Sequence, residues 1–145
     1  MELVQHAITV DDDMAALPET RRAAAEWLAG GPVDAATRDD VLLVLTELVA
    51  NAMALAAGPV TVALSVGDDG VRLSVTNPPT DSTLPPPERW EDPGPDGDRG
   101  RGLAIVRRVC PAVAVSADPD RTEVVCCWPS ADGEDLVEAG EAEQP

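Results

Sequence analysis

The chain has 145 residues, which is enough for one domain with a single hydrophobic core. Its net charge of −17 argues against a nucleic acid or an anionic membrane surface as a partner, because both require a basic face. A partner with a basic surface suits it better. All ten basic residues are arginine, which excludes Schiff-base chemistry and any phosphate-binding loop that depends on a lysine.

The three cysteines have neither the number of a disulfide framework nor the spacing of a zinc site. They are expected to be buried thiols in a reducing compartment. The N-terminus lacks a basic region followed by an apolar run, and the longest aliphatic run, residues 41–45, is far too short to span a membrane. The sequence therefore predicts a cytoplasmic protein.

The first third of the chain predicts one strand and two helices. Residues 2–10 alternate like an edge strand, and residues 14–29 form an Ala-rich helix. A second helix is predicted over residues 37–56, where apolar side chains recur at spacings of three and four. Asp34 or Thr37 can cap its start, and a Gly-Pro pair ends it.

Two polar side chains interrupt the apolar pattern of this second helix. Glu47 and Asn51 are four residues apart, so both leave the same face of the helix, one turn from each other. A carboxylate and an amide in such a position cost free energy if they are buried without partners. The identity of their partner is therefore the functional question.

The rest of the chain predicts two hairpins and a short helix. Residues 60–66 and 71–76 alternate with a period of two around a Gly-Asp-Asp-Gly turn, and one of their faces is apolar. A short helix over residues 103–109 precedes a second hairpin of residues 112–117 and 122–128. This order predicts an α+β fold, a two-layer sandwich in which helices cover one face of a mostly antiparallel sheet.

Two segments have the composition of irregular structure. Half of the fourteen prolines fall between residues 78 and 95, and a connection of this length is typical of a functional lid or a disordered insert. Residues 130–145 carry six acidic side chains and no basic one, and are expected to be a disordered tail after a folded domain of residues 1–129. Between the loop and the last helix lies Gly-Arg-Gly, residues 100–102, where free N–H groups favour a phosphate.

These features have the order and spacing of a known family. Glu-Leu-Val-Ala-Asn-Ala at residues 47–52 resembles the N box of the GHKL ATPases, which share the ATP-binding fold of histidine kinases, gyrase and Hsp90. Residues 39–46 and 100–106 resemble more narrowly the anti-sigma-factor serine/threonine kinases of sporulation and general stress and their actinobacterial relatives. Arg121-Thr122 and the Val-rich strand after it resemble the closing motif of that subgroup. The resemblance covers residues 14–129.

The resemblance implies a site for ATP and Mg²⁺. Asn51 would ligate the metal, since an amide oxygen suits this hard cation. Glu47 would be the catalytic residue that orients or deprotonates the attacking group, either a serine hydroxyl of an antagonist protein or a water. Asn77 and Thr122 would lie at the adenine end, and residues 78–99 would form the lid.

The phosphates would be held where the last helix begins. The resemblance implies that backbone N–H groups of the two glycines face them, that Arg101 or Arg99 adds positive charge, and that the first leucine of the helix belongs to the same nucleotide-binding set. In chain order these residues are Arg99, Gly100, Arg101, Gly102 and Leu103.

The sequence departs from the family at the adenine end. The family has Asp-Gly where this chain has Asn77-Pro78-Pro79. Asn77 can still accept a hydrogen bond from the adenine amino group, but it lacks the charge that strengthens such a bond by on the order of 1 kcal/mol. The prolines remove backbone donors and stiffen the entrance. Weaker adenine recognition is therefore expected.

The sequence thus predicts an ATP-binding regulatory protein that acts by partner switching between a sigma factor and a phosphorylatable antagonist, with a homodimer as one possible assembly. One alternative is a degenerate GHKL pseudo-kinase, a protein-binding module with weak or no nucleotide binding. Another is the catalytic fragment of a sensor histidine kinase, although this chain contains no helix that carries a phosphorylatable histidine.

Overall fold

A computed structural model describes residues 4–10, 14–55, 59–78, 87 and 101–129 of the chain. The predicted lid, apart from residues 78 and 87, lies outside these residues, and so does the predicted acidic tail. The predicted strands and helices are all present, with ends within three residues of those predicted. In chain order they are β1 (Val4–Val10), a 3₁₀ turn (Met14–Ala16), α1 (Leu17–Ala29), α2 (Ala35–Leu55), β2 (Val60–Gly67), β3 (Gly70–Asn77), α3 (Arg101–Val109), β4 (Ala112–Asp118) and β5 (Arg121–Pro129).

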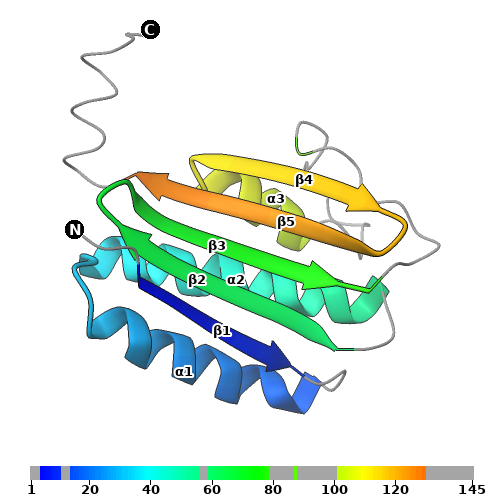
Figure 1. The fold of residues 1–145 in the computed structure, drawn as a ribbon, viewed down its shortest axis with the longest axis horizontal. Helices are drawn as coiled ribbons and strands as arrows, with labels where there is room; N and C mark the ends of the chain where they lie inside the picture. Colours follow the sequence, from blue (N-terminus) through cyan, green and yellow to red (C-terminus); the bar gives the residue numbers. More distant parts are fainter. Residues whose placement is uncertain (1–3, 11–13, 56–58, 79–86, 88–100, 130–145) are drawn as a thin grey trace, which may run out of the picture.

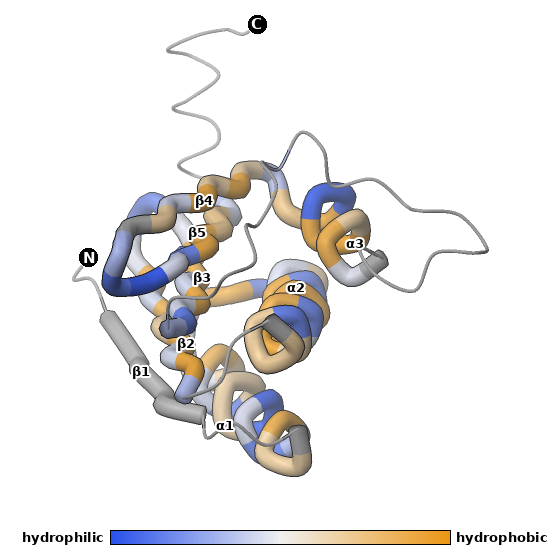
Figure 2. The backbone as a smooth tube through the Cα atoms, turned by 90° about the vertical axis from the view of Figure 1, so that its right-hand side faces the viewer, coloured by the Kyte–Doolittle hydropathy of each residue, from blue (hydrophilic) through white to orange (hydrophobic). Residues whose placement is uncertain are grey.

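The strands form one five-stranded antiparallel sheet in the order β1-β2-β3-β5-β4. All three helices lie against the same face of this sheet (Figure 1). Figure 2, which views the domain from its end, shows the sheet on one side and the helices on the other. This arrangement confirms the predicted α+β sandwich, with β1 at an edge of the sheet as expected.

The core lies between the sheet and α2. Every second residue of β2, β3 and β5 faces the helices, because side chains alternate along a strand. These residues pack against an apolar stripe of α2, in which side chains three and four apart share a face. The largest side chains that are fully buried here are Leu28, Leu45, Leu64 and Leu73, joined by Val41, Val44, Val49, Val60, Val62, Val75 and Val106.

The outer face of the sheet differs from the prediction at one position. The alternation of β3 predicts that Ser74 is exposed, but only 8% of it is accessible. The side chain of Glu123 on β5 lies beside it, and the Ser74 hydroxyl donates a hydrogen bond of 2.6 Å to Glu123 Oε2. A carboxylate that accepts this bond satisfies a hydroxyl that burial would otherwise penalise.

The ends of the helices follow from single residues. Asp34 Oδ1 accepts a hydrogen bond of 2.7 Å from the backbone N–H of Thr37, so Asp34 is the residue that caps α2. This bond lowers the pKa of the Asp34 carboxyl. At the end of α1, the backbone N–H of Gly30 donates a hydrogen bond to the carbonyl of Trp27. In the turn between β2 and β3, Gly70 has a φ of 119°, a conformation that favours glycine. Among the described residues, no helix is both long and apolar enough to cross a membrane.

Candidate functional site

The polar pair predicted from the sequence lies on the central helix, α2. Glu47 and Asn51 are both half-buried, while their neighbours Leu48, Val49 and Ala52 are buried in the core. α2 packs against α1 on one side and α3 on the other. The two polar side chains therefore leave the helix on a face that still reaches the surface of the domain.

Glu47 meets the first turn of α3. A Cβ atom built on Gly102 would lie 2.5 Å from Glu47 Oε1 and 3.5 Å from both Cβ and Cδ of Glu47. Real Cβ atoms do not approach other heavy atoms to 2.5 Å, so a side chain at this position would require the carboxylate end of Glu47 to move. Gly102 has no positive φ, so the backbone conformation does not itself call for glycine here. The structure thus brings together two features that lie 55 residues apart in the sequence.

A second group of polar side chains lies where β3 ends and β5 begins. Asn77 is the last residue of β3 and is paired with Thr122 across the sheet. Because side chains alternate, both share the helix-covered face with Val75 and Val124. Asn77 is only 7% exposed, and its Nδ2 donates a hydrogen bond of 2.7 Å to the carbonyl of Pro78. Figure 1 shows this end of the sheet beside the C-terminal end of α2, the half of the helix that carries Asn51.

The remaining predicted site residues are placed only in part. Arg99 and Gly100 lie outside the described residues, and Arg101 begins α3. Leu103 is 6% exposed and belongs to the core, so its side chain packs inside the domain, and only its backbone can take part in a site. The described residues contain no cluster of three or more His, Cys, Asp or Glu side chains that could hold a metal ion.

The sequence did not reveal the contact between Glu47 and Gly102. A glycine in the first turn of a helix lowers helix propensity, and this was the available signal that something lies close to it. The resemblance implied that Asn77 and Thr122 lie at the same end of the site, but their direct pairing across the sheet could not be predicted, because register between distant strands is set by the assembled sheet.

The arrangement has a clear chemical character. A carboxylate stands beside the first turn of a helix, where backbone N–H groups lack intrahelical partners and the helix dipole is positive. An amide follows one turn along α2, and a buried amide and a hydroxyl lie at the end of the sheet. A ligand with an anionic group at the start of α3 and a planar polar group at the end of the sheet would match these positions.

The domain is an α+β sandwich, an antiparallel sheet with three helices on one face. Its candidate site lies between the polar pair of the central helix and the end of the sheet. The sequence profile of the histidine kinase-like ATPase domain matches residues 10–128, and the chain belongs to this family.

A similar solved structure is that of the RsbU and RsbW domains of Rv1364c from Mycobacterium tuberculosis. It superposes with a TM-score of 0.63 at 21% sequence identity, over 88% of this chain and 34% of that chain. At this identity the likeness supports the fold, and this chain spans about a third of the solved one. A comparison with curated protein sequences gave no match.

Proposed function

We propose that the domain binds ATP with Mg²⁺ between α2, α3 and the ends of β3 and β5, and that it acts as an ATP-dependent regulatory protein of the anti-sigma-factor kinase type. The observation that carries the proposal is the close approach of Glu47 to Gly102, which puts this carboxylate beside the start of α3. Membership of the histidine kinase-like ATPase family supports it.

Asn51 and Glu47 would have distinct roles in this site. Asn51 would give its amide oxygen to Mg²⁺, which usually takes only one or two protein ligands and completes its octahedron with phosphate oxygens and water. Glu47, one turn earlier, would orient the attacking hydroxyl and accept its proton. When bound, ATP supplies the phosphoryl group. The N–H groups at the start of α3, that of Gly102 among them, would face its phosphates.

Asn77 and Thr122 would hold the base. The hydrogen bond from Asn77 Nδ2 to Pro78 fixes the amide, so that Oδ1 points away from that carbonyl and can accept from an amino group. An adenine amino group is such a donor. Because Asn77 is neutral, we expect this contact to be weaker than one made by a carboxylate.

The partners belong to the same proposal. The motifs of residues 39–52 and 100–106 resemble those of anti-sigma-factor kinases, and the similar solved structure contains an RsbW domain together with an RsbU domain. We therefore propose a sigma factor and a phosphorylatable antagonist as partners, with partner switching in the cytoplasm. The net charge of −17 suits a basic surface on either one.

The test is transfer of radiolabelled phosphate from ATP to a serine of a co-encoded antagonist protein. The Glu47→Gln variant, which keeps the size of the side chain, should lose transfer while ATP still raises its melting temperature. If the variant transfers phosphate as fast as the natural protein, the role of Glu47 is wrong.

One observation favours a second function. The buried Asn77 and the Pro78 that follows it replace the charged acceptor and the glycine of the family, and this weakens the adenine end. A pseudo-kinase that binds its partner protein without nucleotide would fit this entrance. Such a protein would show no change in melting temperature with ATP and Mg²⁺, but would still form a complex with the partner.

A further inference from the structure

A cavity of about 410 Å³ opens at the end of α1, on the connection between α1 and α2. Its apolar walls are Trp27 and Leu28 of α1, Pro32 of the connection and Val66 of β2. Its volume falls within the roughly 300–1,000 Å³ range of ligand pockets.

The cavity lies at the opposite end of the domain from the candidate nucleotide site. Val66 lies at the end of β2 and is paired with Val71 near the start of β3, whereas Asn77 is the last residue of β3. Figure 1 shows the connection from α1 to α2 at one end of the sheet and the end of β3 at the other. A molecule bound in the cavity would therefore leave the nucleotide site accessible.

Two glycines line the cavity, and neither is required by the backbone. Gly30 has a helical φ of −82°, and Gly31 likewise has no positive φ. A Cβ on Gly30 would come no closer than 3.6 Å to another atom, and one on Gly31 no closer than 3.8 Å, which are ordinary contacts. What both residues provide is the space that a side chain would otherwise fill.

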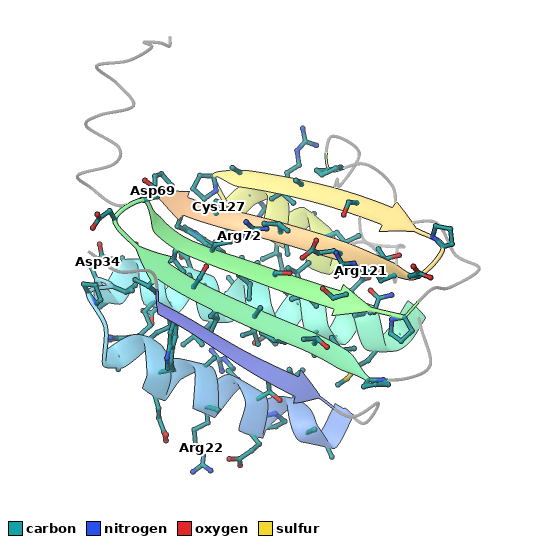
Figure 3. All side chains as sticks on the ribbon, viewed as in Figure 1. Arg22, Asp34, Asp69, Arg72, Arg121 and Cys127 are labelled. Carbon is teal, nitrogen blue, oxygen red and sulfur yellow. The ribbon has the colours of Figure 1, made fainter. Side chains whose placement is uncertain are left out.

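One acidic side chain lines this apolar cavity, and two more lie at the same end of the domain. Glu26 lines it directly, and its side chain is exposed. Figure 3 shows Asp34 and Asp69 at the same end of the domain, and both are exposed. Asp34 also accepts a hydrogen bond from Thr37, which lowers the pKa of its carboxyl.

We propose that this cavity is a docking site for a protein partner that inserts one large aliphatic side chain flanked by arginine or lysine residues. The apolar walls fit the aliphatic side chain, and the acidic surroundings fit the basic neighbours. Glu26 is the single charged side chain among the lining residues, which suits the side chain of a peptide better than a polar small molecule, since the latter needs several converging polar groups. This site goes beyond the nucleotide-binding function and does not depend on it.

The test uses a fluorescein-labelled peptide, Arg-Arg-Leu-Arg-Arg, and fluorescence anisotropy with the full chain in the absence of nucleotide. The control peptide has serine in place of the leucine and therefore the same charge. We expect the leucine peptide to bind at least about tenfold more tightly than the serine peptide, and Glu26→Gln to weaken it about threefold. Equal affinity for the two peptides, or no binding of either at millimolar concentration, would overturn the proposal.

Two variants fill the cavity. Gly30→Leu and Gly31→Leu should weaken binding of the leucine peptide at least about tenfold. Gly30→Ala and Gly31→Ala should leave the melting temperature unchanged or raise it, because both positions accept a Cβ. As a measurement on the natural protein, the backbone amide NMR signals of Gly30 and Gly31 and the indole signal of Trp27 should shift on titration. Shifts confined to other parts of the domain would contradict the site. ATP titrations of the same samples report separately on the nucleotide site.

Discussion

At Gly102 the absence of a side chain lets α3 lie directly against the carboxylate of Glu47. The contact lies in the first turn of a helix whose neighbouring residues, Leu103 and Val106, are buried in the core. Two effects oppose each other at this position. Alanine would favour the helix by about 0.5–1 kcal/mol over glycine, but its methyl group would meet Glu47 Oε1. Which effect is larger at Gly102 can be measured.

A double-mutant cycle tests this contact. Gly102→Ala should destabilise the natural protein by about 1 kcal/mol, because the Glu47 carboxylate must swing away. In the Glu47→Ala background the same substitution should stabilise the protein by about 0.5–1 kcal/mol, since helix propensity alone remains. Urea unfolding of the four proteins measures both values. The same cost in both backgrounds would show that the two residues do not interact.

Asn77 stands where the sequence departs from the pattern of the family that it resembles. In Asn77→Asp, a carboxylate replaces the Nδ2 group that now donates to the carbonyl of Pro78, so the unfolding free energy should fall by about 1 kcal/mol. The charge should at the same time strengthen the contact with an adenine amino group and raise ATP affinity about tenfold. Isothermal titration calorimetry checks the affinity. Asn77→Ala is the control, and it should bind ATP more weakly than the natural protein; the assignment fails if Asn77→Asp binds no more tightly than Asn77→Ala.

At the scale of elements, α2 organises the domain. It contacts α1, α3 and the sheet, and it carries both Glu47 and Asn51. Its start is fixed by Asp34, whose carboxylate satisfies the N–H of Thr37, a donor that the helix leaves without a partner. The position of the polar pair therefore depends on a helix that is held at its first turn and along its buried face.

The cap gives a pH dependence with a definite sign. The pKa of Asp34 is lowered in the folded state, so its contribution to stability is present above the unfolded pKa, about 3.9, and is lost as the pH falls through the folded value. Asp34→Ala should therefore melt at a lower temperature than the natural protein at pH 7, and the difference should shrink below about pH 4. Asp34→Asn, which keeps an oxygen acceptor, should retain most of the stability. A difference that is independent of pH would contradict the charged cap.

The elements were predictable because their signals are local. The alternation of residues 60–66 and 71–76, the 3.6-residue pattern of α2 and the break at Gly30 each depend on neighbouring residues, and the structure confirms them. Contacts between distant segments were not predictable. The burial of Ser74 depends on Glu123 of β5, for which the alternation of β3 contains no information.

At the scale of the whole molecule, the two ends of the sheet differ in character. One end places Asn77 opposite Thr122, near the C-terminal half of α2. The other end carries the cavity beside Trp27 and the acidic side chains of Asp34 and Asp69. A nucleotide and a basic partner could therefore occupy the same domain together, which a regulatory ATP-binding protein requires if one is to control the other.

The central claim is that Glu47 and Asn51 face a nucleotide with its magnesium ion. The most direct test is the melting temperature with ATP, with and without Mg²⁺, for the natural protein and for Asn51→Ala. The natural protein should be stabilised by about 2.7 kcal/mol when ATP is at a hundred times its dissociation constant and Mg²⁺ is present. Asn51→Ala should lose the part of this gain that depends on Mg²⁺. No change in the melting temperature of the natural protein at millimolar ATP and Mg²⁺, or an unchanged magnesium-dependent gain in Asn51→Ala, would contradict the account.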